Sequence, residues 1–348
     1  MRDVTRVEDD VRRALRATAD ALVVDDRDFD ASATRMVERP TRDRARRSRH
    51  RFVVATVVLI VLVAAAAIVR QTAGTNKGRT AEAPPTSVPA GATTSTTAPI
   101  PTSSQPAPAA LIAQVASVPI SALDVVGAGN VAPPAITLPG PVLTEDGKPR
   151  IIWIGAEYCP FCAAERWPLI VALARFGTFS ALRVTASAAV TPSGVPEVYP
   201  DTQTFSFHGS TYTSDNLAFD AVEQTNRAYR PLDVATPDEE TLFRRFDAPP
   251  YVTGAGSIPF VDLANMQLVS GASFSPAVLQ GASADDIARA LSDPTSDIAK
   301  AVDGTADLFT AEFCTLTNNQ PANVCSDPMI THIQNSPQAK STSTAPSG

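Results

Sequence analysis

Two cysteines three positions apart, Cys159 and Cys162, carry the clearest chemistry in the sequence. The apolar run Ile151 to Ile154 predicts a strand before them, and residues 160–176 have the three- and four-residue apolar spacing of a helix. Cys159 would directly precede that helix, and Pro160 suits its first position because proline has no N–H to leave unpaired. The free N–H groups and the helix dipole would stabilise a Cys159 thiolate, the form that attacks disulfides. The spacing therefore predicts Cys159 as the nucleophile and Cys162 as the resolving thiol of thiol–disulfide exchange.

A bare cysteine pair also fits two other kinds of site. A zinc site of four cysteines usually needs two close pairs, whereas Cys314 and Cys325 are eleven positions apart and far downstream. A structural disulfide between Cys159 and Cys162 would close a small, strained ring, and such bridges are usually redox-labile. Thiol–disulfide exchange is the favoured interpretation. It requires no cofactor and no metal, and it requires an exposed Cys159.

The stretch IIWIGAEYCPFC resembles the thioredoxin superfamily, in which an apolar strand runs into an Ala-Glu-aromatic-Cys-x-x-Cys turn. The Pro-Phe pair between the cysteines is similar to that of glutaredoxin-like members. The resemblance implies a cis-proline facing the cysteines, and Pro259, between Ile258 and the strand pattern Phe260 to Leu263, fits that role. The backbone around Ile258 and Pro259 would then pair with an extended substrate segment as an added strand. Over residues 110–330 the chain looks like an uncharacterised thioredoxin-like domain-of-unknown-function family of archaea and actinobacteria.

The sequence departs from the thioredoxin pattern in two places. Trp153 stands where thioredoxins carry a buried carboxylate, and the candidates to replace it, Glu157 and Glu165, are expected to be surface residues. The separation between the cysteine pair and Pro259 is also long, so residues 188–250 are expected to form an insertion.

Within the expected insertion, alternating residues flank the turn pair Gly209-Ser210. Thr204 to His208 and Thr211 to Ser214 therefore predict a β-hairpin, which would shape a substrate groove or cover the sheet. His208 is expected on a solvent-facing strand.

Helical patterns resume at Asp285 to Leu291 and Asp297 to Phe313, and the second of these leads into Cys314. A bridge from Cys314 to Cys325 would close a short polar loop and fasten the end of the domain. A structural disulfide is favoured, and a relay that exchanges electrons with Cys159 and Cys162 is the alternative.

Residues 52–69 are 18 apolar positions without a charge, bracketed by arginines, and they predict a single transmembrane helix. A cleaved signal peptide is the alternative, but its apolar core would be shorter and would not follow 51 polar residues. The arginine-rich segment 1–51 is expected in the cytoplasm, which places the chain after residue 70 outside it. The predicted localisation is thus the cell membrane, with an extracytoplasmic C-terminal domain where disulfides persist.

Composition divides the rest of the 348 residues. Residues 70–109 are rich in Pro, Thr and Ser and are expected to be a disordered linker, as is the tail 334–348. Residues 111–348 hold 12 basic and 24 acidic side chains, a net charge of −12, which argues against nucleic acid as a partner.

The expected fold of residues 110–333 is α/β, a thioredoxin-like sheet with flanking helices and the inserted hairpin, preceded by the transmembrane helix. The expected function is a membrane-anchored thiol–disulfide oxidoreductase, whose partners are protein thiols or disulfides of the cell envelope. The alternative is a catalytically inactive thioredoxin-like binding or scaffold module with structural cysteines.

Overall fold

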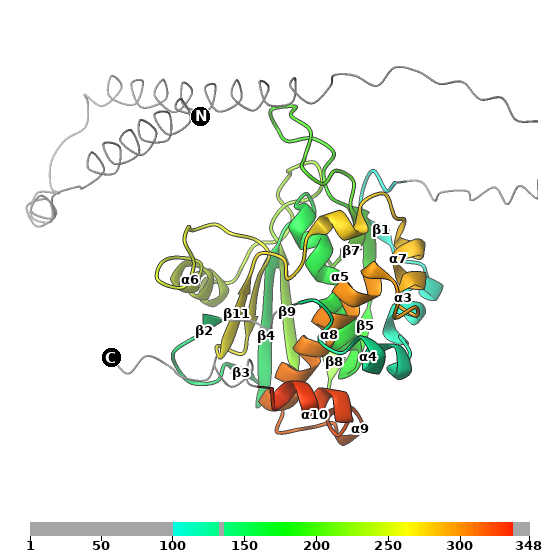
Figure 1. Ribbon diagram of the computed structural model, residues 1–348. Coiled ribbons are helices and arrows are strands. Elements are labelled where there is room, and N and C mark those ends of the chain that lie inside the picture. The colour runs from blue at the N-terminus through cyan, green and yellow to red at the C-terminus, as the bar shows by residue number, and fades with distance from the viewer. Residues whose placement is uncertain (1–99, 132–135, 337–348) are drawn as a thin grey trace, which may run out of the picture. The chain divides into compact units, whose positions relative to one another are not determined.

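Six strands form the central sheet of the computed structural model, which describes residues 100–131 and 136–336 (Figure 1). Strand β4 lies at the centre of the sheet and pairs with β10 on one side and with β9 on the other. The β4–β9 pair is parallel and the other pairs of this sheet are antiparallel. In spatial order the strands are β2 (Ile136–Thr137), β11 (Gln267–Ser270), β10 (Phe260–Leu263), β4 (Lys148–Gly155) and β9 (Ala218–Glu223). The short strand β3 (Thr144–Glu145) pairs with the first two residues of β4.

The sheet separates two apolar cores, and alternate side chains of β4 point into each. Ile151 and Trp153 belong to the larger core, which also holds residues of helices α5 (Pro160–Ala174) and α8 (Asp297–Leu316). Ile152 and Ile154 belong to the smaller core beneath α6 (Pro237–Phe246). Figure 1 shows α6 on one side of the sheet and the packed pair α5 and α8 on the other. A strand covered on both faces needs a continuous apolar run, and residues 151–154 supply it. The architecture is mixed α/β.

The remaining helices surround α5 and α8. Helix α7 begins at a capping box, in which the Ser283 side chain accepts from the Asp286 N–H and the Asp286 carboxylate accepts from the Ser283 N–H. The helices predicted over 285–291 and 297–313 are confirmed as α7 and α8, and α8 runs three residues further. The other bounds are α3 (Ala109–Ala116), α4 (Ile120–Val126), the 3₁₀ turn η2 (Pro276–Leu279), α7 (Ala284–Ala290), α9 (Ala322–Cys325) and α10 (Pro328–Gln334).

The hairpin predicted around Gly209-Ser210 is wrong. Strand β7 (Gln203–Ser206) pairs with β6 (Arg183–Ala186), and β8 (Thr211–Ser214) pairs with β5 (Gly177–Ser180). Both therefore run along the same preceding segment, in the same direction. The turn itself exists, since Gly209 has a φ of 72° and the Ser210 N–H and hydroxyl both donate to the Phe207 carbonyl. Residues 207–210 connect β7 to β8 without reversing the direction of the chain. Phe205 before this turn and Phe207 within it are buried in the same core.

The expectation that residues 188–250 form an insertion is wrong for residues 218–223. These residues are β9, which pairs with β4 from Arg150↔Ala218 to Gly155↔Glu223. The segment expected to be an insertion thus contributes one strand of the central sheet. Two loops, 187–202 and 224–236, remain outside the strands and reach toward the cysteine pair.

The folded region begins earlier than the composition predicts. Strand β1 (Gln105–Pro106) lies in the stretch expected to be a linker, yet it pairs with β6 as an edge strand. Arg183 fastens this segment by donating to the Ser104 hydroxyl and carbonyl. At the other end, α10 reaches Gln334, the first residue of the expected tail.

The predicted cytoplasmic segment 1–51 and transmembrane helix 52–69 lie outside the described residues. Within residues 100–131 and 136–336, no single helix has the length and apolar composition needed to cross a membrane. Helices α3 and α4 meet those criteria only as a pair, bent by 54°.

Candidate functional site

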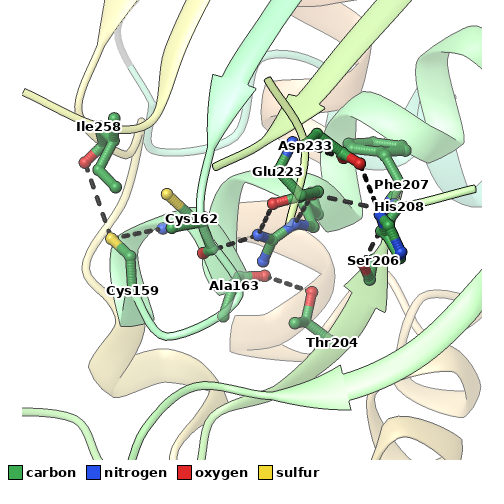
Figure 2. Close-up of polar contacts among 12 residues, drawn as sticks. Cys159, Cys162, Ala163, Thr204, Ser206, Phe207, His208, Glu223, Asp233 and Ile258 are labelled. Atoms are coloured by element: carbon green, nitrogen blue, oxygen red, sulfur yellow. Dashed lines mark hydrogen bonds and ion pairs between the residues drawn. The ribbon is translucent and has the colours of Figure 1, made fainter. Parts of the chain in front are cut away.

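The cysteine pair lies where the central strand turns into a helix. Strand β4 ends at Gly155, and Cys159 is the N-cap of α5, with an extended backbone (φ −77°, ψ 122°) and Pro160 at the first helical position. The Cys162 N–H donates to the Cys159 sulfur at 3.3 Å (Figure 2). The Cys159 sulfur therefore occupies the capping position that orients it toward the free N–H groups of the helix. Both cysteines are free thiols.

The structure brings Ile258 to this sulfur across 99 residues of sequence. The Cys159 Sγ lies 3.8 Å from the Ile258 carbonyl oxygen (Figure 2). The Ile258–Pro259 peptide bond is cis, and β10 begins at the next residue and pairs with β4. The adjacency of β4 and β10 thus places the loop before Pro259 beside the cysteine turn. All four residues singled out for exchange and substrate contact lie at one place.

The pKa values of the two thiols move in opposite directions. Hydrogen bonding from the Cys162 side chain lowers the pKa of Cys159, and this effect outweighs burial. The Cys162 N–H and the positive charge of Arg166 lower it further. Burial raises the pKa of Cys162 well above its ordinary value, and the hydrogen bond to Cys159 adds to the increase. Cys159 therefore loses its proton more readily than Cys162.

A fully buried ion pair, Arg166 with Glu223, lies behind the cysteine turn. Arg166 Nε donates to Glu223 Oε1 at 2.8 Å and Nη2 donates to Oε2 at 2.7 Å, and both side chains have an exposed fraction of 0%. The guanidinium also lies over the ring of Trp153, 5.3 Å from its centroid. Sequence reasoning did not single out this pair. The one available signal was that Arg166 and Glu165 are the two charged residues in the otherwise apolar run of α5.

Both glutamates expected on the surface are buried. Glu165 has an exposed fraction of 0% and accepts hydrogen bonds from the Ser273 N–H and hydroxyl, each at 2.7 Å. Burial raises the pKa of Glu165 to about 7. Glu157 is buried beside the cysteine turn, and its Oε1 has no hydrogen-bond partner among the described residues. The surface prediction fails because the covering segments, including the loop after β11, come from distant parts of the sequence.

Cys159 is less exposed than predicted, with an exposed fraction of 6%. Aromatic side chains from the two loops cover the motif. Tyr229 stacks on Tyr158 with ring centroids 4.3 Å apart, and its hydroxyl donates to Glu197 at 2.6 Å. Phe161, between the cysteines, keeps an exposed fraction of 41%. The expectation of an openly exposed nucleophile is therefore wrong for this conformation.

Tyr199 completes this arrangement from the loop 187–202. Its ring meets Phe161 edge-on, with centroids 5.9 Å apart. Beyond the cover, a groove of about 900 Å³ adjoins the motif. The lining includes Phe161 from the cysteine motif and Ile258 from the loop before β10. The lining residues are Ile136, Phe161, Pro249, Pro250, Tyr251, Val252, Thr253, Gly256, Ser257, Ile258, Ser270 and Gly271.

His208 lies in the turn after β7, where sequence analysis expected a solvent-facing strand. Its Nδ1 is 2.6 Å from Asp233 Oδ1, and the ring is partly exposed. The other Asp233 oxygen accepts the Glu223 N–H at 3.1 Å. Polar contacts therefore lead from the buried Arg166–Glu223 pair to the surface (Figure 2).

Cys314 and Cys325 form a disulfide with a Cα–Cα distance of 5.4 Å. It joins the end of α8 to α9, and both residues are buried. In the part of the chain that the structure describes, no three His, Cys, Asp or Glu side chains are grouped to hold a metal ion.

A family model described as a domain of unknown function, DUF929, matches residues 139–254. The match covers β4, the cysteine pair, α5 and β9, and it ends before Pro259. Searches of curated proteins and of solved structures found no match.

Proposed function

We propose that this protein is a thioredoxin-like thiol–disulfide oxidoreductase in which Cys159 attacks and Cys162 resolves. The observation that carries the proposal is the position of the Cys159 sulfur, which caps α5, accepts the Cys162 N–H and faces the carbonyl of Ile258 before a cis-proline. The opposite pKa shifts of the two thiols support separate roles for them. Strand, cysteine motif, helix and facing cis-proline together match what the thioredoxin resemblance implies.

The exchange conserves atoms and electrons. The Cys159 thiolate attacks one sulfur of a substrate disulfide, so a mixed disulfide forms and the second substrate sulfur leaves as a thiolate. Cys162 then loses its proton and attacks Cys159, which releases the first substrate sulfur. Two electrons pass to the substrate, its two sulfurs take up the protons, and Cys159 and Cys162 become a disulfide. An external protein dithiol restores them, and the same steps in reverse oxidise a substrate dithiol.

The substrate site in this proposal lies at the groove and the loop before β10. The backbone of Ile258 would pair with an extended segment of the substrate protein, and the groove would hold the side chains that flank its cysteine. The proposed setting is the cell envelope, with residues 52–69 as the membrane anchor and the folded domain outside the cytoplasm. The basic flank before that span and the apolar span itself support this orientation.

A scaffold with idle cysteines is the second candidate, and the 6% exposed fraction of Cys159 favours it. The aromatic cover contributed by the two loops has to move before a protein substrate reaches the sulfur. The oxidoreductase candidate requires the aromatic cover to move under native conditions, whereas the scaffold candidate does not.

Trapping of the mixed disulfide tests the proposal. The full chain with Cys162→Ala is mixed with a peptide containing a disulfide and analysed without reductant. The expected result is a covalent peptide adduct at Cys159 that a reductant removes. The matched variant Cys159→Ala should form no adduct, and equal adducts in both variants, or none in either, would contradict the proposed roles.

A further inference from the structure

We propose that Arg166, held by Glu223, is the positioning residue that fixes the Cys159 turn and supplies the positive charge that favours its thiolate. This inference rests on the proposed function, since it assigns a device that prepares the nucleophile. The chain would then have a buried cation behind the cysteines. The thioredoxin pattern leads one to expect a buried carboxylate near this place, at the position that Trp153 occupies.

The contact with the turn runs through the carbonyl of Ala156. This oxygen accepts the Cys159 N–H at 3.3 Å and also Nη2 of Arg166 at 2.8 Å. The guanidinium is therefore one hydrogen-bonded group away from the backbone of the nucleophile. Because Arg166 lies on α5 and Ala156 lies before it, this bond ties the helix to the loop that enters it.

The charge of Arg166 is close to the sulfurs and shielded from water. Arg166 is four positions after Cys162, so the two side chains lie on one face of α5. Its exposed fraction of 0% keeps solvent from screening the interaction. The charge lowers the pKa of both Cys159 and Cys162.

Glu223 holds the arginine from the side away from the turn. Its Oε1 also accepts the Phe207 N–H at 3.3 Å, so its negative charge is anchored to a second segment. Nη1 of Arg166 has no hydrogen-bond partner among the described residues. Among the described residues, the guanidinium therefore donates from Nε and Nη2 to Glu223 and Ala156, and the Nη1 group is a hydrogen-bond donor without an acceptor.

Two kinds of change to this pair distinguish an electrostatic role from a purely structural one. Replacing both partners by methionine removes the cation together with the carboxylate that is hydrogen-bonded to it, a replacement that buried ion pairs often tolerate. Glu223→Gln keeps the shape of the pair but removes the negative charge that is hydrogen-bonded to the cation, while the Glu157 carboxylate still acts on it. An electrostatic role predicts opposite effects on the Cys159 thiolate, whereas loss of packing would act in the same direction in both.

The experiment titrates the ultraviolet absorbance of the thiolate in the full chain with Cys162→Ala, where Cys159 is the remaining free thiol. We expect R166M/E223M to raise the pKa of Cys159 by roughly one unit, about a tenfold drop in thiolate at a fixed pH below that pKa. We expect E223Q to lower it. Arg175→Met is the matched control, because Arg175 is the C-cap of the same helix but pairs with Asp307, and it should leave the titration unchanged.

Unchanged titrations, or shifts of the same sign in R166M/E223M and E223Q, would overturn the inference. If the double variant does not fold, as judged by circular dichroism and urea unfolding, the sign of the shift in E223Q decides alone. Absence of a mixed disulfide at Cys159 in the trapping experiment would contradict the proposed function itself. Normal trapping with an unmoved titration would contradict the role of Arg166 alone.

Discussion

Cys159 and Cys162 carry the same side chain, and their surroundings give the two thiols different reactivity. The Cys159 sulfur accepts an N–H at the start of a helix, whereas Cys162 is enclosed by apolar side chains. The proposed attack by the first and resolution by the second rest on this difference, because a thiolate is the attacking species. The same dependence on surroundings applies to the buried carboxyl of Glu165.

Glu165→Gln tests the burial of that carboxyl. Burial raises the pKa of Glu165 to about 7 from its ordinary 4.5, so its contribution to stability is complete below pH 4.5 and is lost as the pH rises through 7. We expect the Gln variant to avoid that loss and to be more stable than the original chain at pH 8, by roughly 1–3 kcal/mol. Urea unfolding from pH 4.5 to pH 8 measures the difference. Glu240→Gln, at an exposed position of α6, is the control, and an equal pH dependence in all three proteins would contradict the assignment.

At the residue scale, the sequence predicts the chemistry of a side chain when that chemistry depends on residues close to it in the chain. Cys159, Pro160 and Cys162 are adjacent in the chain, so their relation to a helix start could be predicted. Burial of Glu165 depends on Ser273, 108 residues away, and could not be predicted from its own neighbours. The Arg166–Glu223 pair likewise forms only when β9 reaches β4.

At the scale of elements, two loops close over the cysteine turn. The loop 187–202 supplies Glu197 and Tyr199, and the loop 224–236 supplies Tyr229. The Tyr229–Glu197 hydrogen bond joins the loops to one another, and the stack on Tyr158 fastens them to the turn. We therefore expect access to Cys159 to depend on these few contacts.

Tyr229→Ala removes both the stack and the hydrogen bond to Glu197. We expect Cys159 to react with a bulky maleimide several-fold faster in this variant, because the cover is weakened and the helix cap is untouched. Stopped-flow alkylation at saturating pH measures the rate. Val198→Ala, an exposed change in the other loop, 187–202, should leave the rate unaltered. A rate in Tyr229→Ala that equals that of the original chain would show that the loops do not limit access.

The Cys314–Cys325 bridge fastens the end of α8 to α9, and its loss separates the structural role from the relay. The double change Cys314→Ala and Cys325→Ala should lower the free energy of unfolding by about 2–4 kcal/mol, because the unfolded chain gains the freedom of the opened loop. Under the structural role, the redox potential of Cys159 and Cys162 stays the same. A stable variant with a shifted potential would favour the relay.

Local patterns predicted β4, α5, β10, α7 and α8, since each has an apolar period or a cap signal within its own residues. They also located β7 and β8, but the predicted pairing of these two strands with each other is wrong, because both find their partners in residues 177–186. Strand β9 was missed for the same reason, because its pairing with β4 is a long-range contact.

At the scale of the whole molecule, the composition separates the folded region from the N-terminal segments, but its boundary falls too late. β1 contains no long apolar run, and its pairing with β6 depends on contacts made by Arg183. Composition measures apolar content and therefore misses a segment held by backbone pairing and arginine side chains.

Deletion of residues 52–69 tests the proposed anchor. The full chain is expected to remain with membranes after alkaline extraction, because an 18-residue apolar span is long enough to insert. The deleted form should be released. Replacement of 52–69 by a polar stretch of equal length is the control for linker length, and retention of either altered form on membranes would contradict the anchor.

Site-resolved alkylation of the native chain tests the central claim most directly. The full protein is exposed briefly to a small thiol reagent at neutral pH, and the labelled peptides are quantified by mass spectrometry for Cys159 and for Cys162. We predict rapid labelling of Cys159 and protection of Cys162 until the protein is unfolded. Labelling of both only after unfolding, or labelling of Cys162 first, would contradict it.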